Sequence, residues 1–181
     1  MKRLFVLCAL CGLSAAASAA TWTIAPGSTL DFDTSFEQAP LHGKFEHFSG
    51  RITLDPKHPN ACSFDVTINP GSAKTGNPTG DTQIRSTPFF DIAHYPQAIY
   101  RATQCRWNGK GPIEVLGTLT LRGVSKAVPL HAELHNDGKT ATLDAQATVN
   151  RLDFGVGQGQ WASASIISKT VTIKAHLLLM H

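Results

Sequence analysis

The sequence predicts an all-β protein, built as an antiparallel sandwich or a closed barrel. Apolar and polar residues alternate along one segment after another, which places one set of side chains on a single face of a sheet. The pairs Asn108-Gly109 and Asp137-Gly138 lie between such segments and favour tight hairpin turns. Many short alternating strands joined by turns are typical of these two architectures.

Four strands are expected in the first half of the chain. They are Trp22–Ile24, Leu30–Phe36, Lys44–Leu54 and Cys62–Ile68. The second of these places Phe32 and Phe36 on the same face. The fourth alternates most clearly, because Phe64, Val66 and Ile68 share a face with Cys62 while polar residues separate them. The segment 55–60, which contains two prolines, forms the turn between the third and fourth strands.

The alternation stops between Ser72 and Pro96. Glycine, asparagine and proline residues interrupt this stretch, Thr79–Ser86 has the composition of a short helix, and Pro88 excludes a long helix. A loop of this length in a compact β domain usually has a function or covers one end of a barrel. We therefore expect a short helical cover here.

Five further strands are expected after this interruption. They are Ala98–Trp107, Ile113–Arg122, Val128–Leu134, Thr140–Arg151 and Lys169–Leu179. Each of the last four has apolar residues at every second position, and the turn pairs named above precede the second and the fourth of the five. The alternation therefore continues to the C-terminus.

The first 19 residues have the pattern of a cleavable export signal. Lys2 and Arg3 precede an apolar run from Leu4 to Leu13, and Ala17-Ser18-Ala19 is a small-residue cleavage site. The apolar run is too short for a membrane span of about 20 residues. We expect residues 1–19 to be removed and residues 20–181 to form one domain in the periplasm or outside the cell.

Composition excludes several classes of function. The chain has 16 Lys and Arg and 13 Asp and Glu, and no basic face of the kind that binds nucleic acid is evident. His131 and His135 lie in an expected strand, where a spacing of four residues does not bring two ligands to one metal ion. No nucleophile motif is present. We expect no enzyme activity, no metal and no cofactor.

Two cysteines, Cys62 and Cys105, remain after the expected cleavage. In an oxidising compartment, an isolated pair of this kind most simply forms a disulfide. The alternative is a pair of separate buried thiols.

Several motifs, in their order and spacing, resemble the YceI-like family. They are Gly43-Lys44-Phe45, Phe48–Ile52, Thr75-Gly76, Asp81, Arg85-Ser86, Phe89-Phe90-Asp91, Tyr95-Pro96, Gly117–Lys126 and Asn150–Gly155. The resemblance implies an antiparallel, lipocalin-like barrel of about eight strands with a short helical cover. It also implies a non-enzymatic protein that binds a long isoprenoid or a quinone-like amphiphile inside the barrel.

The sequence departs from this family in two places. Phe36 stands after the first strand, where many members have histidine, and many members read Arg-Asp-x-His-Leu where this chain reads Gly80-Asp81-Thr82-Gln83-Ile84. The run from Gly155 to Trp161 resembles a branch that accompanies cytochrome-b561-type membrane proteins. The resemblance therefore also suggests a membrane redox partner.

Aromatic and aliphatic side chains are the candidate ligand contacts. An apolar cavity suits a long hydrocarbon chain, because burial of each CH₂ group contributes about 0.8 kcal/mol. The alternative is that these side chains fill a solid core, and a barrel of about eight strands can be either filled or hollow. The candidates are Phe32, Phe36, Phe45, Phe64, Phe89, Phe90, Trp107 and Leu119.

Arg151 is the candidate for a head-group contact. It continues the apolar face of Ala147 and Val149, so its side chain is expected to point inward. The alternative is an internal ion pair with Asp153 or Asp81, since buried charges are normally paired.

Two rival functions remain at the level of sequence. In the first, the barrel is filled, and loops such as Ser72–Pro96 bind a membrane redox protein. In the second, the chain is an outer-membrane barrel, whose apolar face would point toward lipid and whose interior would be polar.

Overall fold

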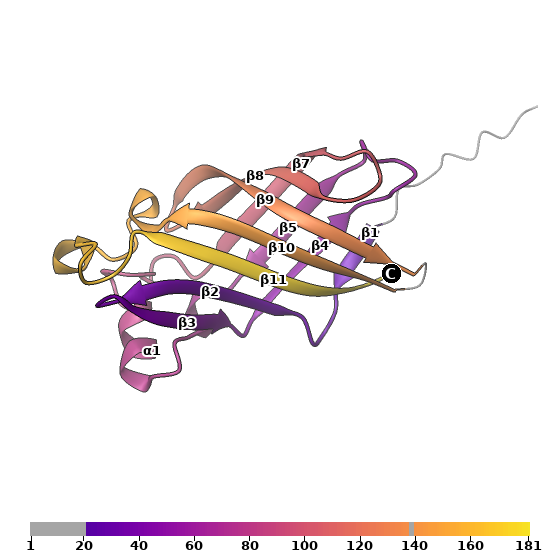
Figure 1. Cartoon of the computed structure of the whole chain (residues 1–181). Coiled ribbons are helices and arrows are strands. Elements are labelled where there is room, and N and C mark those ends of the chain that lie inside the picture. The colour runs from indigo at the N-terminus through magenta and orange to yellow at the C-terminus, as the bar shows by residue number, and fades with distance from the viewer. Residues whose placement is uncertain (1–20, 138–139) are drawn as a thin grey trace, which may run out of the picture.

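Eight antiparallel strands close into a barrel (Figure 1). The computed structural model describes residues 21–137 and 140–181. The ring closes because the first strand, β1, pairs with the last, β11, through Thr23 opposite Met180. In ring order the strands are β1 (Thr21–Ile24), β4 (Phe48–Thr53), β5 (Ser63–Ile68), β7 (Ala98–Arg106), β8 (Ile113–Leu121), β9 (Val124–Asn136), β10 (Thr140–Asn150) and β11 (Thr170–Met180).

A hairpin extends the barrel wall beyond β1. The strand β11 is long enough to pair with β1 near its end and with β2 (Thr29–Phe36) along its middle. The strand β2 pairs in turn with β3 (Ala39–Phe45), whose last two residues pair with the short strand β6 (Ala73–Lys74). Where β11 extends beyond its pairing with β1, the barrel wall is therefore built by β2 and β3.

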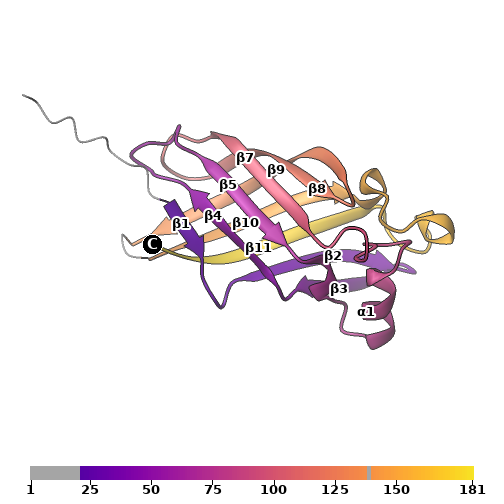
Figure 2. The ribbon, with the colours of Figure 1, turned by 180° about the vertical axis from the view of Figure 1, so that it is seen from behind.

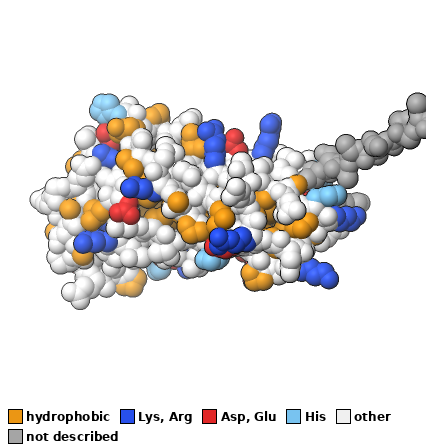
Figure 3. Space-filling model, turned by 90° about the horizontal axis from the view of Figure 1, so that it is seen from above, with side chains coloured by type: hydrophobic (Ala, Val, Ile, Leu, Met, Phe, Trp, Pro, Cys, Tyr) orange, Lys and Arg blue, Asp and Glu red, His pale blue; other side chains and the backbone are white. Residues whose placement is uncertain are grey.

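The register keeps the apolar face of the strands inside. Leu143 lies opposite Leu177, and Ala147 lies opposite Ile173, while Gln146 and Lys174 between them are exposed. On the outside, Figure 3 shows charged side chains of both signs dispersed among apolar and polar ones. This inward apolar face is the reverse of the arrangement expected for the outer-membrane alternative.

The interior is packed at the end that contains the C-terminus. Trp22, Ile52, Leu54, Ile113 and Val115 are almost completely buried there. Trp22 also donates a hydrogen bond from Nε1 to the carbonyl oxygen of Leu54 and stacks on the ring of His181. This half of the barrel is a conventional solid core.

The opposite end is covered by one short helix and two 3₁₀ turns (Figures 1 and 2). The helix α1 (Pro78–Arg85) confirms the expected helical cover. The 3₁₀ turns are η2 (Arg151–Phe154) and η3 (Gly159–Ala162), and a third turn, η1 (Pro70–Ser72), precedes β6. None of the residues of α1 is fully buried, so the helix lies on the barrel as a cover and not as part of its core.

Three expected strand boundaries were wrong. The expected strand Lys44–Leu54 is two strands, because the backbone changes partners at Glu46 and His47, which bond to Ser72 and Asn69. The strand β9 begins at Val124 and not at Val128, because Arg122 and Gly123 form a tight turn with positive φ. Arg151 begins a 3₁₀ turn instead of ending β10. The expected turn at Asn108-Gly109 lies between the paired strands β7 and β8. The strands β9 and β10 also pair, and the expected turn between them includes Gly138, which lies outside the described residues.

Cys62 and Cys105 form the expected disulfide at the packed end of the barrel. Their Cα atoms are 5.9 Å apart, inside the usual range for such a bond. A shift in the register between β7 and β8, after Ala102, accompanies the approach of Cys105 to the start of β5. The expected export signal, residues 1–19, lies outside the described residues.

Arg151 organises the backbone at the covered end. Its five guanidinium N–H groups are the full donor set of an arginine. Nε donates to the carbonyl oxygen of Ser168, and the other nitrogens donate to those of Val156, Gly157, Trp161 and Ile167, at 2.7–3.0 Å. The alternative of an internal ion pair with Asp153 or Asp81 was wrong, because Asp153 accepts from Asn150 and Asp81 pairs with Lys74. Burial lowers the pKa of Arg151.

We predict that replacing both Cys62 and Cys105 with alanine lowers the free energy of unfolding. The two positions are 43 residues apart in sequence, so the loss is about 4 kcal/mol from the entropy that the cross-link removes from the unfolded chain. Equilibrium unfolding in urea measures it. Reductant should bring the wild type to the level of the variant, and equal stability of oxidised wild type and variant would contradict the prediction.

We also predict that Arg151→Met lowers the free energy of unfolding by about 3 kcal/mol or more, because it leaves five carbonyl groups without their donor. Arg151→Lys should lose less but not recover the wild-type value, since an ammonium group has three donors and no planar fork. The exposed Arg101, whose pair with Asp65 is on the surface, is the control: Arg101→Met should change stability by less than about 1 kcal/mol. Wild-type stability of Arg151→Met would rule out this role.

Candidate ligand cavity

The covered half of the barrel is hollow. It contains a cavity of about 530 Å³, within the range of about 300–1,000 Å³ that is usual for small-molecule sites. Its wall is almost entirely apolar, with residues from every barrel strand except β1. The strands β2 and β3, the helix α1 and the two 3₁₀ turns complete it. The barrel is thus solid at one end and open inside at the other.

The structure places seven of the eight expected lining residues at this cavity. These are Phe32, Phe36, Phe45, Phe64, Phe89, Phe90 and Leu119. Trp107 is the exception, because it follows β7 at the packed end of the barrel, where it lies against the core. Whether the seven contact a ligand stays a prediction.

The phenyl rings form a connected wall near the cover. Phe45 lies between Phe32 and Phe90, with ring centroids 5.4 Å and 5.8 Å away. Both distances lie within the range of about 4.5–7 Å that is usual for aromatic pairs in contact. Phe89 packs on Trp161 at 5.5 Å. Phe36 ends β2 at the tip of the β2–β3 hairpin and is 38% exposed.

Two glycines in the strands make room for rings of this wall. A Cβ atom on Gly43 would lie 2.1 Å from the ring of Phe32, and one on Gly117 would lie 2.1 Å from the ring of Tyr100. Glycine inside a strand often marks such a close approach. The hydroxyl of Tyr100 donates to the carbonyl oxygen of Val128, and burial raises its pKa, so the group stays protonated.

Several lining residues were missed when the sequence was read alone. Tyr100, Phe154 and Trp161 contribute large rings to the wall. Phe154 and Trp161 belong to segments that the sequence marked only as motifs. On β10, Ala145 and Ala147 are also at the wall, and their small side chains leave space. The alternation of β10 placed both on the inward face, but only the closed barrel shows which inward positions meet the cavity and which the core.

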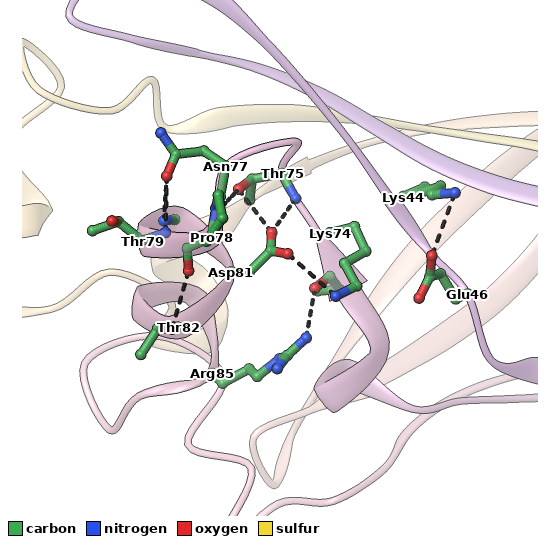
Figure 4. A network of polar contacts seen from close by, with 12 residues as sticks. Lys44, Glu46, Lys74, Thr75, Asn77, Pro78, Thr79, Asp81, Thr82 and Arg85 are labelled. Atoms are coloured by element: carbon green, nitrogen blue, oxygen red, sulfur yellow. Dashed lines mark hydrogen bonds and ion pairs between the residues drawn. The ribbon is translucent and has the colours of Figure 1, made fainter.

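The polar residues at the cavity come mainly from α1 and the residues just before it, and Figure 4 shows the side chains of Thr75, Asn77 and Thr79 among them. Thr75, Asn77, Thr79, Gly80 and Gln83 line this part of the rim. Asn77 caps the helix, since its Oδ1 accepts from the N–H groups of Thr79 and Gly80.

Asp81 anchors α1 to the barrel. Its carboxylate accepts from the N–H of Thr75 at 2.6 Å and from the Thr75 hydroxyl at 3.0 Å, and it pairs with Lys74 at 3.3 Å (Figure 4). The pKa of Asp81 lies below its ordinary value, mainly because its carboxylate accepts the hydrogen bond from the N–H of Thr75. The pairing with Lys74 lowers this pKa further. The contribution of this anchor to stability is therefore present at neutral pH and is lost only as the pH falls through that lowered pKa.

Within residues 21–137 and 140–181, no group of three or more His, Cys, Asp or Glu side chains is arranged to hold a metal ion. No helix in the same ranges is long and apolar enough to cross a membrane.

Comparison with known proteins agrees with this architecture. The YceI-like domain family matches residues 22–179. Protein YceI of Salmonella arizonae and that of Salmonella newport are each 35% identical over 122 residues, which are 64% of this chain and 63% of the relative. The match thus spans less than two thirds of the length of these curated relatives.

Solved structures share the fold. BcnA of Burkholderia cenocepacia has a TM-score of 0.80 at 29% identity, and the match covers 83% of this chain and 95% of that one. A YceI protein of Campylobacter jejuni has a TM-score of 0.68 at 26% identity, covering 77% and 84%. A polyisoprenoid binding domain from Saccharophagus degradans has a TM-score of 0.71, covering 90% and 99%, and its 18% identity shows the fold alone. With the family match over nearly all of its described length, and with the closed barrel and its hollow half, the chain belongs to the YceI-like family.

Proposed function

We propose that this protein is an exported carrier that binds a long-chain isoprenoid or a quinone-like amphiphile in its barrel. The observation that carries the proposal is the cavity of about 530 Å³ with an almost wholly apolar wall. A hydrocarbon chain gains free energy from such a wall at roughly 25 cal/mol for each Å² of apolar surface removed from water.

The hollow half argues against the rival function. That rival required a filled barrel, whereas only the end with Trp22, Ile52 and Val115 is packed. The similarity to a domain described as polyisoprenoid binding is consistent with a lipid ligand, although at 18% identity it concerns the fold. A membrane redox partner has no specific observation in its favour.

We propose that the protein functions in the periplasm or outside the cell. The disulfide between Cys62 and Cys105 supports this, since such bonds persist in oxidising compartments. The pattern of residues 1–19 is that of an export signal. A carrier in an aqueous compartment would shield a hydrocarbon chain from water.

Native mass spectrometry of the protein from its own host, followed by lipid extraction, tests the proposal directly. We expect an additional mass that corresponds to a long-chain amphiphile. We also expect an isoprenoid quinone to raise the midpoint of thermal unfolding, because a ligand that binds only the folded state stabilises it. If extraction yields no lipid and no long-chain amphiphile shifts the midpoint, the carrier function is wrong.

Adjacent residues of β10 provide a matched test of the site. Ala145 lines the cavity, and Gln146 beside it is exposed on the outer face. We predict that Ala145→Phe weakens quinone binding at least tenfold, because the new ring occupies the space of the ligand, and that Gln146→Phe does not. Titration calorimetry gives both affinities, and thermal unfolding without ligand checks that each variant is folded. Equal effects of the two changes would place the ligand elsewhere.

A further inference from the structure

We infer that the cavity selects amphiphiles whose head group is uncharged, a hydroxyl or a carbonyl, and that the side-chain amides of Asn77 and Gln83 recognise this group. The inference rests on the proposed carrier function and names the class of head group that the same site accepts.

The first step is that the wall offers no charged group to a ligand. Of the described residues that line the cavity, Arg151 alone carries a charge. All five of its N–H groups already donate to backbone carbonyl oxygens. An anionic head group would have to break these bonds, and the carbonyl groups left behind would lose their donor.

The second step is that the cations beside the cover are also engaged. Lys74 pairs with Asp81 at 3.3 Å, and Arg85 donates from Nη2 to the carbonyl oxygen of Ala73 (Figure 4). Arg122 donates to the carbonyl oxygens of Thr87 and Phe89. Within the described chain, Nε of Arg85 is buried without a hydrogen-bond partner, but Arg85 does not line the cavity. The basic side chains around the cover thus serve the fold of the cover itself.

The third step concerns neutral polar groups at the rim. The Oδ1 atom of Asn77 caps α1, and its NH₂ group has no hydrogen-bond partner among the described residues, so it can donate to a ligand. Gln83 donates from Nε2 to Ser86 and keeps its Oε1 and a second N–H. In the close view, the NH₂ group of Asn77 points away from the helix that its oxygen caps (Figure 4). These two amides supply both donors and an acceptor, which is what a hydroxyl or a carbonyl requires.

The energetic consequence follows from the environment of these groups. Moving an ion into an apolar site without a partner costs much more than moving a neutral polar group that finds a hydrogen bond. Water at the rim lowers the free-energy cost of placing an ion there, so the difference in cost between charged and neutral head groups is smaller than in a dry site. We expect the binding affinity for the neutral head group to be at least tenfold higher.

Three probes with the same hydrocarbon chain test this: geranylgeraniol, geranylgeranoic acid and geranylgeranyl phosphate. Calorimetric titration at neutral pH should show the alcohol binding at least tenfold more tightly than either anion. The acid should gain affinity toward about pH 4, as its carboxyl group is protonated, while the alcohol should not change. The anchor of α1 at Asp81 persists there, because its pKa lies below the ordinary value.

A pair of variants in α1 locates the effect. Gln83 lines the cavity, and Thr82 beside it is exposed and does not. Gln83→Lys places a free cation at the rim and should strengthen binding of the phosphate at least tenfold while weakening that of the alcohol. Thr82→Lys adds the same charge to the same helix, faces solvent and should leave the order of affinities as in the wild type.

The outcomes separate this inference from the carrier function. If all three probes bind the wild type equally, or an anion binds best, the head-group inference is wrong and the carrier function stands. If both lysine variants shift the affinities equally, α1 does not present the recognition groups at Gln83, and the inference is wrong. If none of the probes binds, the carrier function fails and the inference fails with it.

Discussion

The closure of β1 on β11 is the constraint on which the rest of the structure depends. An alternating strand has an apolar face, but that face becomes an interior only when the sheet returns to itself. Here β11 pairs with β1 near its end and with β2 along its middle. The ring is therefore tight at one end, where Trp22 and Leu54 fill it. It is wide at the other, where the β2–β3 hairpin extends the wall.

The wide end is closed by α1 and by the segment that follows β10, together with the buried side chains of Phe89, Phe90 and Phe154. The helix α1 has no fully buried residue, and it is attached through a capping asparagine and the contacts of Asp81. The segment from Arg151 to Ser168 folds around the guanidinium group of Arg151. This group donates to five backbone carbonyl oxygens of the segment, which a neighbouring strand would otherwise bind. The charges of Arg151, Asp81 and Lys74 are all paired or hydrogen-bonded within the cover, so the described residues present no unpaired ionic group at the cavity wall. The same contacts that hold the cover thereby set the polarity of the site.

Much of the fold and part of the site can be predicted from the sequence because they depend on local pattern. The alternation at Cys62–Ile68 identifies an inward face, and Phe64 is at the cavity as that face implies. The break of the long third strand at Glu46 and His47 is not visible locally, because it results from backbone partners at Ser72 and Asn69 that are distant in sequence. The same limit applies to Arg151, whose inward direction follows from alternation but whose partners are five carbonyl groups of a later segment.

The sequence by itself determined which residues face inward, where the chain turns, and that a short helix covers one end, since period-two patterning, turn residues and prolines act over a few positions. Only the tertiary structure decided which inward residues pack together and which surround a space. The sequence proposed both Phe64 and Trp107 as aromatic residues of the interior. Phe64 lines the cavity, whereas Trp107 lies against the core at the packed end. The difference depends on the position of each residue along the barrel axis. That position is set by the pairing of strands that are distant in sequence.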